Sequence, residues 1–117
     1  MSENISQDVF NRDEALENVG GMEDLLLELG QTLIDELPKL LLNAHQAIAA
    51  GDAKGVNAAL HSLKGAVTPF AAKRAHAAAW QLEQSAAAGD LSQAAGMMSR
   101  LESELDDLKV ALGSLQA

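Results

Sequence analysis

The sequence predicts an all-α protein, built as an antiparallel four-helix bundle with a short N-terminal lead helix. Apolar residues recur at steps of three and four along the chain, whereas the alternating pattern of a strand is absent. Only three of the 117 residues are aromatic, and the β-branched residues that favour strands are sparse. Two connections read Ala-Ala-Gly-Asp, a sequence that ends one helix and starts the next with almost no loop.

The lead helix is predicted over residues 12–19. Asn11 is a favourable N-cap, and Glu14 stands three residues later, where a capping box has its second partner. The glycine pair at positions 20 and 21 then stops the helix, because helices commonly end at glycine.

The second and third helices form a predicted hairpin, in which Gly51 ends one helix and Asp52 caps the next. Pro38 removes a backbone donor and crowds the preceding turn, so we expect a kink there rather than a domain boundary. The third helix is expected over residues 53–67, and Pro69 ends it by disfavouring helical geometry at the preceding residue. The expected buried positions are Leu26, Leu29, Leu33, Leu37, Leu40, Ala44 and Ile48, followed by Val56, Leu60, Leu63 and Val67.

The fourth and fifth helices form a second predicted hairpin. Gly89 ends the fourth helix, which is expected over residues 70–88, and Asp90 caps the fifth with Gln93 as its capping-box partner. The fourth helix has a mostly small inward stripe, which would let it approach its neighbours closely. The inward stripe of the fourth helix consists of Ala72, Ala75, Ala79, Leu82 and Ala86. The apolar row expected in the fifth helix consists of Ala94, Met98, Leu101, Leu105, Leu108, Leu112 and Leu115.

Composition excludes several classes of function. The chain has no cysteine, which excludes thiol catalysis, disulfide frameworks and cysteine-based zinc sites. No apolar run reaches the roughly 20 residues that span a bilayer, and the basic start of a signal peptide is missing, so we expect a cytoplasmic protein without membrane contact. The net charge of −9 argues against nucleic acid as a partner, which leaves proteins. We expect one domain over residues 9–117, after a disordered tail at residues 1–8.

The negative charge is unevenly distributed along the chain. No acidic residue occurs from position 53 to position 82, and this window of 30 residues has a net charge of +4. The other 87 residues carry four basic and 17 acidic side chains, a net charge of −13. Most of such a surface would repel a phosphoryl group, and the window would tolerate one. Two alanine-rich helices could also lack acidic residues by chance.

Residues 61–65, His-Ser-Leu-Lys-Gly, are the most informative stretch of this window. On a helix, Lys64 and Gly65 lie one turn along from His61. An imidazole near neutrality is largely unprotonated, so a ring nitrogen can attack phosphorus, and Lys64 can neutralise part of the charge of the product. Gly65 removes bulk beside the histidine, at a helix-interior cost of about 1 kcal/mol relative to alanine. The same residues would also fit a surface histidine and lysine beside a helix-packing glycine.

Residues 58–65, Ala-Ala-Leu-His-Ser-Leu-Lys-Gly, resemble the A-H-[ST]-[LI]-K-G signature of histidine-containing phosphotransfer (HPt) domains, which act in bacterial two-component phosphorelays. The resemblance extends over almost the whole chain, through the lead helix with its glycine pair, Pro38 and the Ala-Gly-Asp connections. Residues 69–71 depart from the family pattern, because they read Pro-Phe-Ala where many members have Asn-[IL]-Gly. The junction of the third and fourth helices therefore stays open.

The resemblance implies a phosphotransfer intermediate rather than an enzyme. His61 would be phosphorylated by the aspartyl phosphate of a receiver domain, in a response regulator or a hybrid sensor kinase, and would pass the group to another receiver. Lys64 would assist electrostatically, and Gly65 would give access. The chain lacks the clustered acids that hold Mg²⁺ and a glycine-rich loop for ATP, so we expect no cofactor here and Mg²⁺ in the receiver. Docking would use the second and third helices around His61, and we expect a monomer because a paired site would obstruct the receiver.

Three other classes of function provide alternatives. A phosphorylatable module of a chemotaxis-type histidine kinase would share the H-[ST]-[LI]-K-G motif and is the nearest of them. A metal or haem bundle needs inward-facing ligands, whereas the inward positions here are aliphatic. A helical docking scaffold that is not phosphorylated would keep the bundle without needing the imidazole, so replacing His61 by glutamine distinguishes it from a relay.

The remaining candidate residues are expected to have ordinary roles. His45 and His76 each follow a predicted core position, and we expect them to be partly exposed, without partners at the spacing of a metal or triad site. Trp80 is most simply a packing residue, although its position near the basic residues would allow it to border a docking surface. Phe70 and Met22 are expected in the core, with contacts to a partner as the alternative.

Overall fold

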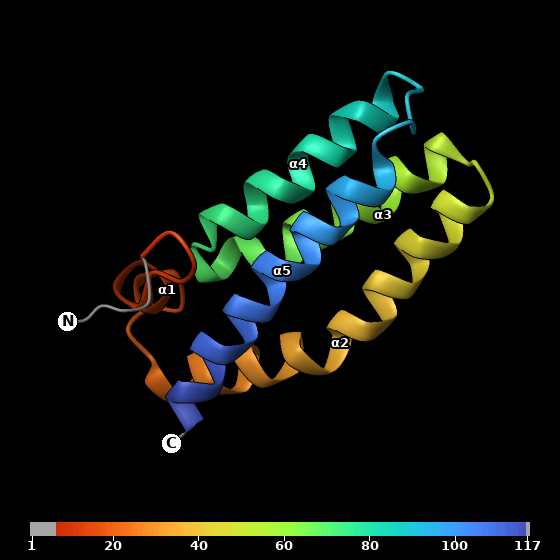
Figure 1. Cartoon of the computed structure of the whole chain (residues 1–117). Coiled ribbons are helices and arrows are strands. Elements are labelled where there is room, and N and C mark those ends of the chain that lie inside the picture. The colour runs from red at the N-terminus through yellow and green to blue at the C-terminus, as the bar shows by residue number, and fades with distance from the viewer. Residues whose placement is uncertain (1–6, 117) are drawn as a thin grey trace.

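The computed structural model describes residues 7–116, which form helices and turns without a strand (Figure 1). Its elements are α1 (Arg12–Asn18), α2 (Glu23–Ala49), α3 (Ala53–Val67), the 3₁₀ turn η1 (Thr68–Phe70), α4 (Lys73–Ala87), α5 (Ala94–Gly113) and the 3₁₀ turn η2 (Ser114–Gln116). The all-α fold expected from the sequence is confirmed. No helix within this range is both long and apolar enough to cross a membrane.

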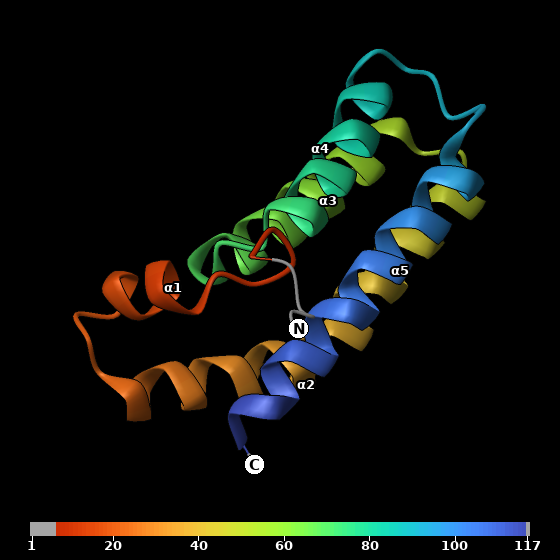
Figure 2. The ribbon, with the colours of Figure 1, turned by 60° about the vertical axis from the view of Figure 1, so that its left-hand side comes forward.

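Helices α2 to α5 form an antiparallel bundle, in which α2 packs on α3, α3 on α4, α4 on α5, and α5 on α2 (Figures 1 and 2). The short helix α1 packs against η1 at one end of the bundle. All four long helices contribute to one apolar core, whose largest fully buried side chains include Leu37, Leu60, Leu63, Leu82, Met98, Leu101, Leu105 and Leu108. The small stripe predicted for the fourth helix is also buried, and it lets α3 and α5 pack closely on either side.

Side-chain caps start α1 and α3 where the sequence predicts them. The carboxamide of Asn11 and the carboxylate of Asp52 each accept a hydrogen bond of 3.0 Å from the backbone N–H three residues later. Gly51 takes the left-handed conformation at φ 66°, which turns the chain directly from α2 into α3. Helix α2 continues through Pro38, and its ribbon bends near its middle in Figure 1.

The junction between α3 and α4 differs from the prediction, because α4 begins at Lys73 rather than at Phe70. Thr68 keeps helical dihedral angles (φ −57°, ψ −43°) although a proline follows it, since the chain tightens there into the 3₁₀ turn η1. The hydroxyl of Thr68 donates to the carbonyl of Lys64 at 2.8 Å. Ala71 then adopts a left-handed conformation with φ 52°, which is uncommon for a residue with a Cβ atom and redirects the chain into α4.

Helix α5 also begins later than predicted, at Ala94 rather than at Asp90. Gly89 is left-handed as expected, with φ 76°. The Asp90 carboxylate accepts hydrogen bonds from the backbone N–H and the hydroxyl of Ser92, at 2.9 and 2.6 Å. These local bonds hold the stretch in a turn that competes with a helix. Gln93 occupies the N-cap position without a side-chain cap, so the predicted capping box is wrong.

The N-terminal segment is attached to the junction between α3 and α4. The side-chain amide of Asn18 donates to the carbonyl of Pro69 at 3.0 Å, and the backbone N–H of Arg74 donates to the carbonyl of Asp8 at 2.9 Å. These bonds join three stretches that are far apart in the sequence. Residues 1–6, part of the segment predicted to be a disordered tail, lie outside the described residues.

Three apolar side chains that the sequence places in the core are exposed. Trp80 is 49% exposed, Met22 56% and Leu29 36%. Phe70 is buried as expected, and its ring is tilted against that of Phe10 with the centroids 6.5 Å apart. The helical repeat gives the direction of a side chain, but burial also requires that another element cover that direction.

Candidate functional site

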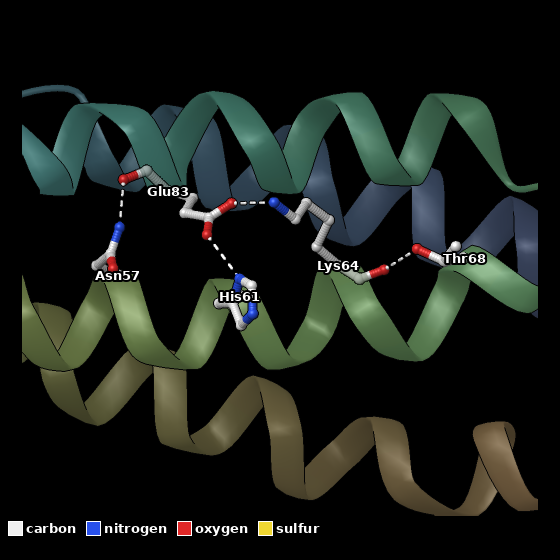
Figure 3. A network of polar contacts seen from close by, with 5 residues as sticks. All are labelled: Asn57, His61, Lys64, Thr68 and Glu83. Carbon is white, nitrogen blue, oxygen red and sulfur yellow. Dashed lines mark hydrogen bonds and ion pairs between the residues drawn. The ribbon is translucent and has the colours of Figure 1, made fainter.

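His61 projects from the exposed edge of α3 that faces α4 (Figure 3). Leu60 and Leu63 are buried beside it and thereby fix the rotation of the helix. The imidazole is 72% exposed, and its Nδ1 atom lies 3.0 Å from Oε2 of Glu83, which reaches across from α4. The second ring nitrogen, Nε2, has no hydrogen-bond partner among the described residues. One nitrogen is therefore held by the protein, while the other is accessible.

Glu83 is the buried centre of this site. Its side chain is 8% exposed, and its second oxygen, Oε1, lies 2.8 Å from the ammonium of Lys64. The backbone carbonyl of Glu83 accepts a hydrogen bond of 2.9 Å from the side-chain amide of Asn57. Lys64 itself is only 22% exposed. A single carboxylate on α4 thus holds both of the charged or titratable side chains that the α3 motif contributes (Figure 3).

The environment of Glu83 determines which nitrogen of His61 carries a proton. Burial alone raises the pKa of a carboxyl group, because it disfavours the charged form. For Glu83, the hydrogen bonds from Lys64 and His61 and their charges outweigh burial and lower the pKa below its ordinary value of 4.5. Glu83 is therefore ionised at neutral pH and can only accept hydrogen bonds. Nδ1 of His61 must then be the donor, and in the neutral ring the lone pair lies on Nε2.

Gly65 lies one helical turn from His61 on α3, and the space beside it is open. A Cβ atom at this position would meet no atom within 4 Å, outside its own helix backbone and chain neighbours. The other glycine inside α3 is different, because a Cβ at Gly55 would fall 2.5 Å from a carboxylate oxygen of Asp52. Gly55 is thus a packing glycine and Gly65 is not. The helix-packing interpretation of the motif glycine is wrong, and the gap is available to an approaching molecule.

The other two histidines lie outside this cluster. His45 is exposed as expected, and it pairs at 3.1 Å with Glu102 of α5, a partner 57 residues away that local spacing does not reveal. His76 is partly exposed and borders a shallow pocket together with Lys73 and Glu14. No group of three or more potential metal ligands comes together within residues 7–116.

The role of Glu83 was not predicted from the sequence, although the sequence holds a signal for it. Glu83 is the first acidic residue after the acid-free window, and it follows His61 by 22 positions. An antiparallel hairpin that turns around residue 72 brings these two positions level with each other. The end of the charge window and the turn position together could have indicated the pair.

The match to a known family covers this whole cluster. A family model described as the Hpt domain matches residues 28–111, which include all of α3 and α4. The chain belongs to the Hpt domain family. Hpt domains are phosphotransfer carriers, so the protein is a phosphotransfer module of two-component signalling.

Two solved structures share the architecture of this Hpt domain. Histidine-containing phosphotransfer protein B (HptB) from Pseudomonas aeruginosa PAO1 is 25% identical with a TM-score of 0.86, and the match covers 93% of this chain and 95% of that one. The HPT domain of an Hpt sensor hybrid histidine kinase from Shewanella is 19% identical with a TM-score of 0.79, and the match covers 94% and 95%. The second likeness concerns the fold alone. No curated protein matches this Hpt domain significantly.

Proposed function

We propose that this Hpt domain accepts a phosphoryl group on Nε2 of His61 from the aspartyl phosphate of a receiver domain and passes it to another receiver. The observation that carries the proposal is the contact between His61 Nδ1 and the ionised carboxylate of Glu83. That contact keeps the proton on Nδ1 and leaves an exposed lone pair on Nε2. An exposed, unprotonated ring nitrogen is the nucleophile that such a transfer requires.

The transfer needs no proton movement within this domain. The lone pair of Nε2 attacks phosphorus, a nitrogen–phosphorus bond forms, and the bond between phosphorus and the aspartyl oxygen breaks. The bonding electrons leave with the aspartate carboxylate of the receiver. The imidazole ring becomes positively charged, and the carboxylate of Glu83, 3.0 Å from Nδ1, stabilises that charge. Reversal of the same steps hands the group to a second receiver.

Lys64 is the residue best placed to meet the incoming phosphoryl group. Its ammonium is held at Glu83, one helical turn from His61, by a side chain with several rotatable bonds. A modest rotation of this side chain would bring the ammonium to the phosphoryl oxygens on Nε2 and offset their negative charge. The Mg²⁺ ion and the other donors to the phosphoryl group would come from the receiver, so the domain acts as a carrier.

The receiver would approach over α3 and the adjoining part of α2. Gly65 provides open space beside His61. An apolar groove of about 150 Å³ lies between α2 and the end of α3, and its lining includes Ala66, the next residue after Gly65, and the partly exposed side chain of Leu29. One partner could cover the histidine and the groove together. A second copy of the domain on this surface would obstruct the receiver, and we therefore propose that the domain works as a monomer.

Intact-mass analysis after incubation with phosphorylated receiver domains and Mg²⁺ tests this proposal. A single phosphoryl adduct, labile to acid, stable to alkali and absent from His61→Gln, is the expected result. The His61→Gln variant should keep the helical content of the wild type, because the imidazole is mostly exposed. If neither receiver domains nor phosphoramidate, a small phosphoryl donor, produced the adduct, the domain would instead be a docking scaffold.

A further inference from the structure

We propose that the exposed face of α4 around Trp80 is a second part of the surface that docks the receiver domain, with the indole as its apolar anchor. This inference rests on the proposed function, because it concerns the partner that exchanges phosphoryl groups with His61. It adds α4 to the surface formed by α2 and α3, and it assigns a role to a side chain that the core does not use.

The exposure of Trp80 is the first observation in favour of this assignment. Trp80 is the single tryptophan of the chain, and 49% of it is open to solvent although the bundle has an apolar core. Tryptophan is among the residues that most often dominate the binding energy of protein interfaces. A half-buried indole also has a fixed base, so less conformational freedom is lost when its outer part is covered.

The position of Trp80 relative to the phosphorylation site is the second observation. Trp80 precedes Glu83 by three residues on α4, and residues three apart lie on the same side of a helix. Glu83 is turned inward to His61 and Lys64, so Trp80 lies on the edge of α4 that borders α3. Helix α4 runs antiparallel to α3 (Figure 1), and Figure 3 shows His61 and Lys64 on either side of Glu83. Moving along α4 from Glu83 back to residue 80 therefore leads towards Lys64. A partner bound over His61 would therefore contact the indole as part of the same continuous surface.

The charge of this face is the third observation, and it selects the kind of partner. The exposed neighbours of Trp80 one turn away, Ala77 and Gln84, are uncharged, and Lys73 lies two turns away. Helix α4 has no acidic residue before Glu83, whose charge is already paired with Lys64. The donor of the proposed reaction carries an anionic aspartyl phosphate, which the acidic remainder of the protein repels. An uncharged to basic face with an apolar anchor, continuous with His61, fits such a partner.

The chain offers a matched control for this role. Val110 on α5 is even more exposed, at 70%, and is likewise an apolar side chain on the surface of a long helix. Helix α5 packs on α2 and α4, and α3 with its histidine lies on the other side of the bundle. Removing the Val110 side chain therefore changes exposed apolar area without touching the surface around His61.

The test compares two phosphoryl donors on Trp80→Ala, Val110→Ala and the wild type. One donor is phosphoramidate, which needs no docking, and the other is the receiver domain that phosphorylates the wild type most efficiently. We expect phosphoramidate to phosphorylate Trp80→Ala at the rate of the wild type. The receiver at low concentration should phosphorylate it about tenfold more slowly than the wild type. Val110→Ala should match the wild type with both donors. Trp80→Gln should behave like Trp80→Ala, and it provides a second variant if alanine disturbs the fold.

Equal transfer from the receiver to Trp80→Ala and to the wild type would overturn the inference while leaving the proposed function intact. The inference would also be overturned if phosphoramidate phosphorylated the wild type but no receiver domain did, because the assigned partner would be wrong. Failure of both donors would instead remove the proposed function. In the wild type, the fluorescence of Trp80 should change when the receiver binds, and an unchanged spectrum at saturating receiver would contradict the docking role.

Discussion

Replacing Glu83 by glutamine should slow phosphorylation of His61 about fivefold. Oε2 of Glu83 accepts a hydrogen bond of 3.0 Å from His61 Nδ1, and Oε1 forms an ion pair of 2.8 Å with Lys64 Nζ. A glutamine has one oxygen and one NH₂ group, so it can accept from only one of them. If the NH₂ group faces His61, the ring proton moves to Nε2 and blocks the nucleophile. If the oxygen faces His61, the NH₂ group opposes the ammonium of Lys64.

The magnitude follows from the burial of the two partners. A hydrogen bond to a charged group contributes about 1.5–3 kcal/mol. The carboxylate is buried but the imidazole is 72% exposed, so water screens the charge that develops on the ring. We therefore use about 1 kcal/mol for the loss of transition-state stabilisation, which corresponds to about a fivefold decrease in rate.

The assay is the rate of adduct formation with phosphoramidate, followed by intact mass and combined with nitrogen chemical shifts of the His61 ring. Phosphoramidate separates the chemistry from docking. Glu104→Gln is the matched control. Glu104 is also nearly buried, at 11% side-chain exposure, and it forms an ion pair of 2.9 Å with Arg74 rather than with the cluster around His61. The variant should lose comparable stability without losing rate. An unchanged rate in Glu83→Gln, with Nδ1 still protonated as in the wild type, would refute the reasoning.

Two further predictions concern access and acid stability. Gly65→Ala should stabilise α3 by up to about 1 kcal/mol in urea denaturation while slowing transfer from a receiver domain. Gly96→Ala, at another open helical glycine, should leave transfer unchanged, and equal transfer rates in the two variants would contradict a role of Gly65 in access. Because the pKa of Glu83 is lowered in the folded state, its ion pairs contribute stability above pH 4.5 and lose it as the pH falls through the folded pKa. The melting temperature of the wild type should therefore fall more steeply below pH 4.5 than that of Glu83→Gln, and parallel profiles would rule out this linkage.

Local signals predicted the first half of the chain well. The caps at Asn11 and Asp52 and the left-handed Gly51 act within a few residues of themselves, and each occurs where the sequence indicates. The starts of α4 and α5 differ from the prediction, because other local features take the place of the expected helix starts. Asp90 binds Ser92 rather than capping a helix, and Ala71 takes a left-handed conformation without the glycine that would have announced it.

The sequence by itself determined that His61, Lys64 and Gly65 lie on one side of α3 next to its buried stripe, because the helical repeat and the buried leucines beside them are properties of a single segment. Only the tertiary structure decided which residue of another helix contacts His61 and Lys64. Glu83 reaches the histidine and keeps a proton on its Nδ1 atom because α3 and α4 pack closely, and this contact spans 22 residues that no local pattern connects. The exposure of Trp80 was decided in the same way, since it depends on which side of α4 the bundle leaves uncovered.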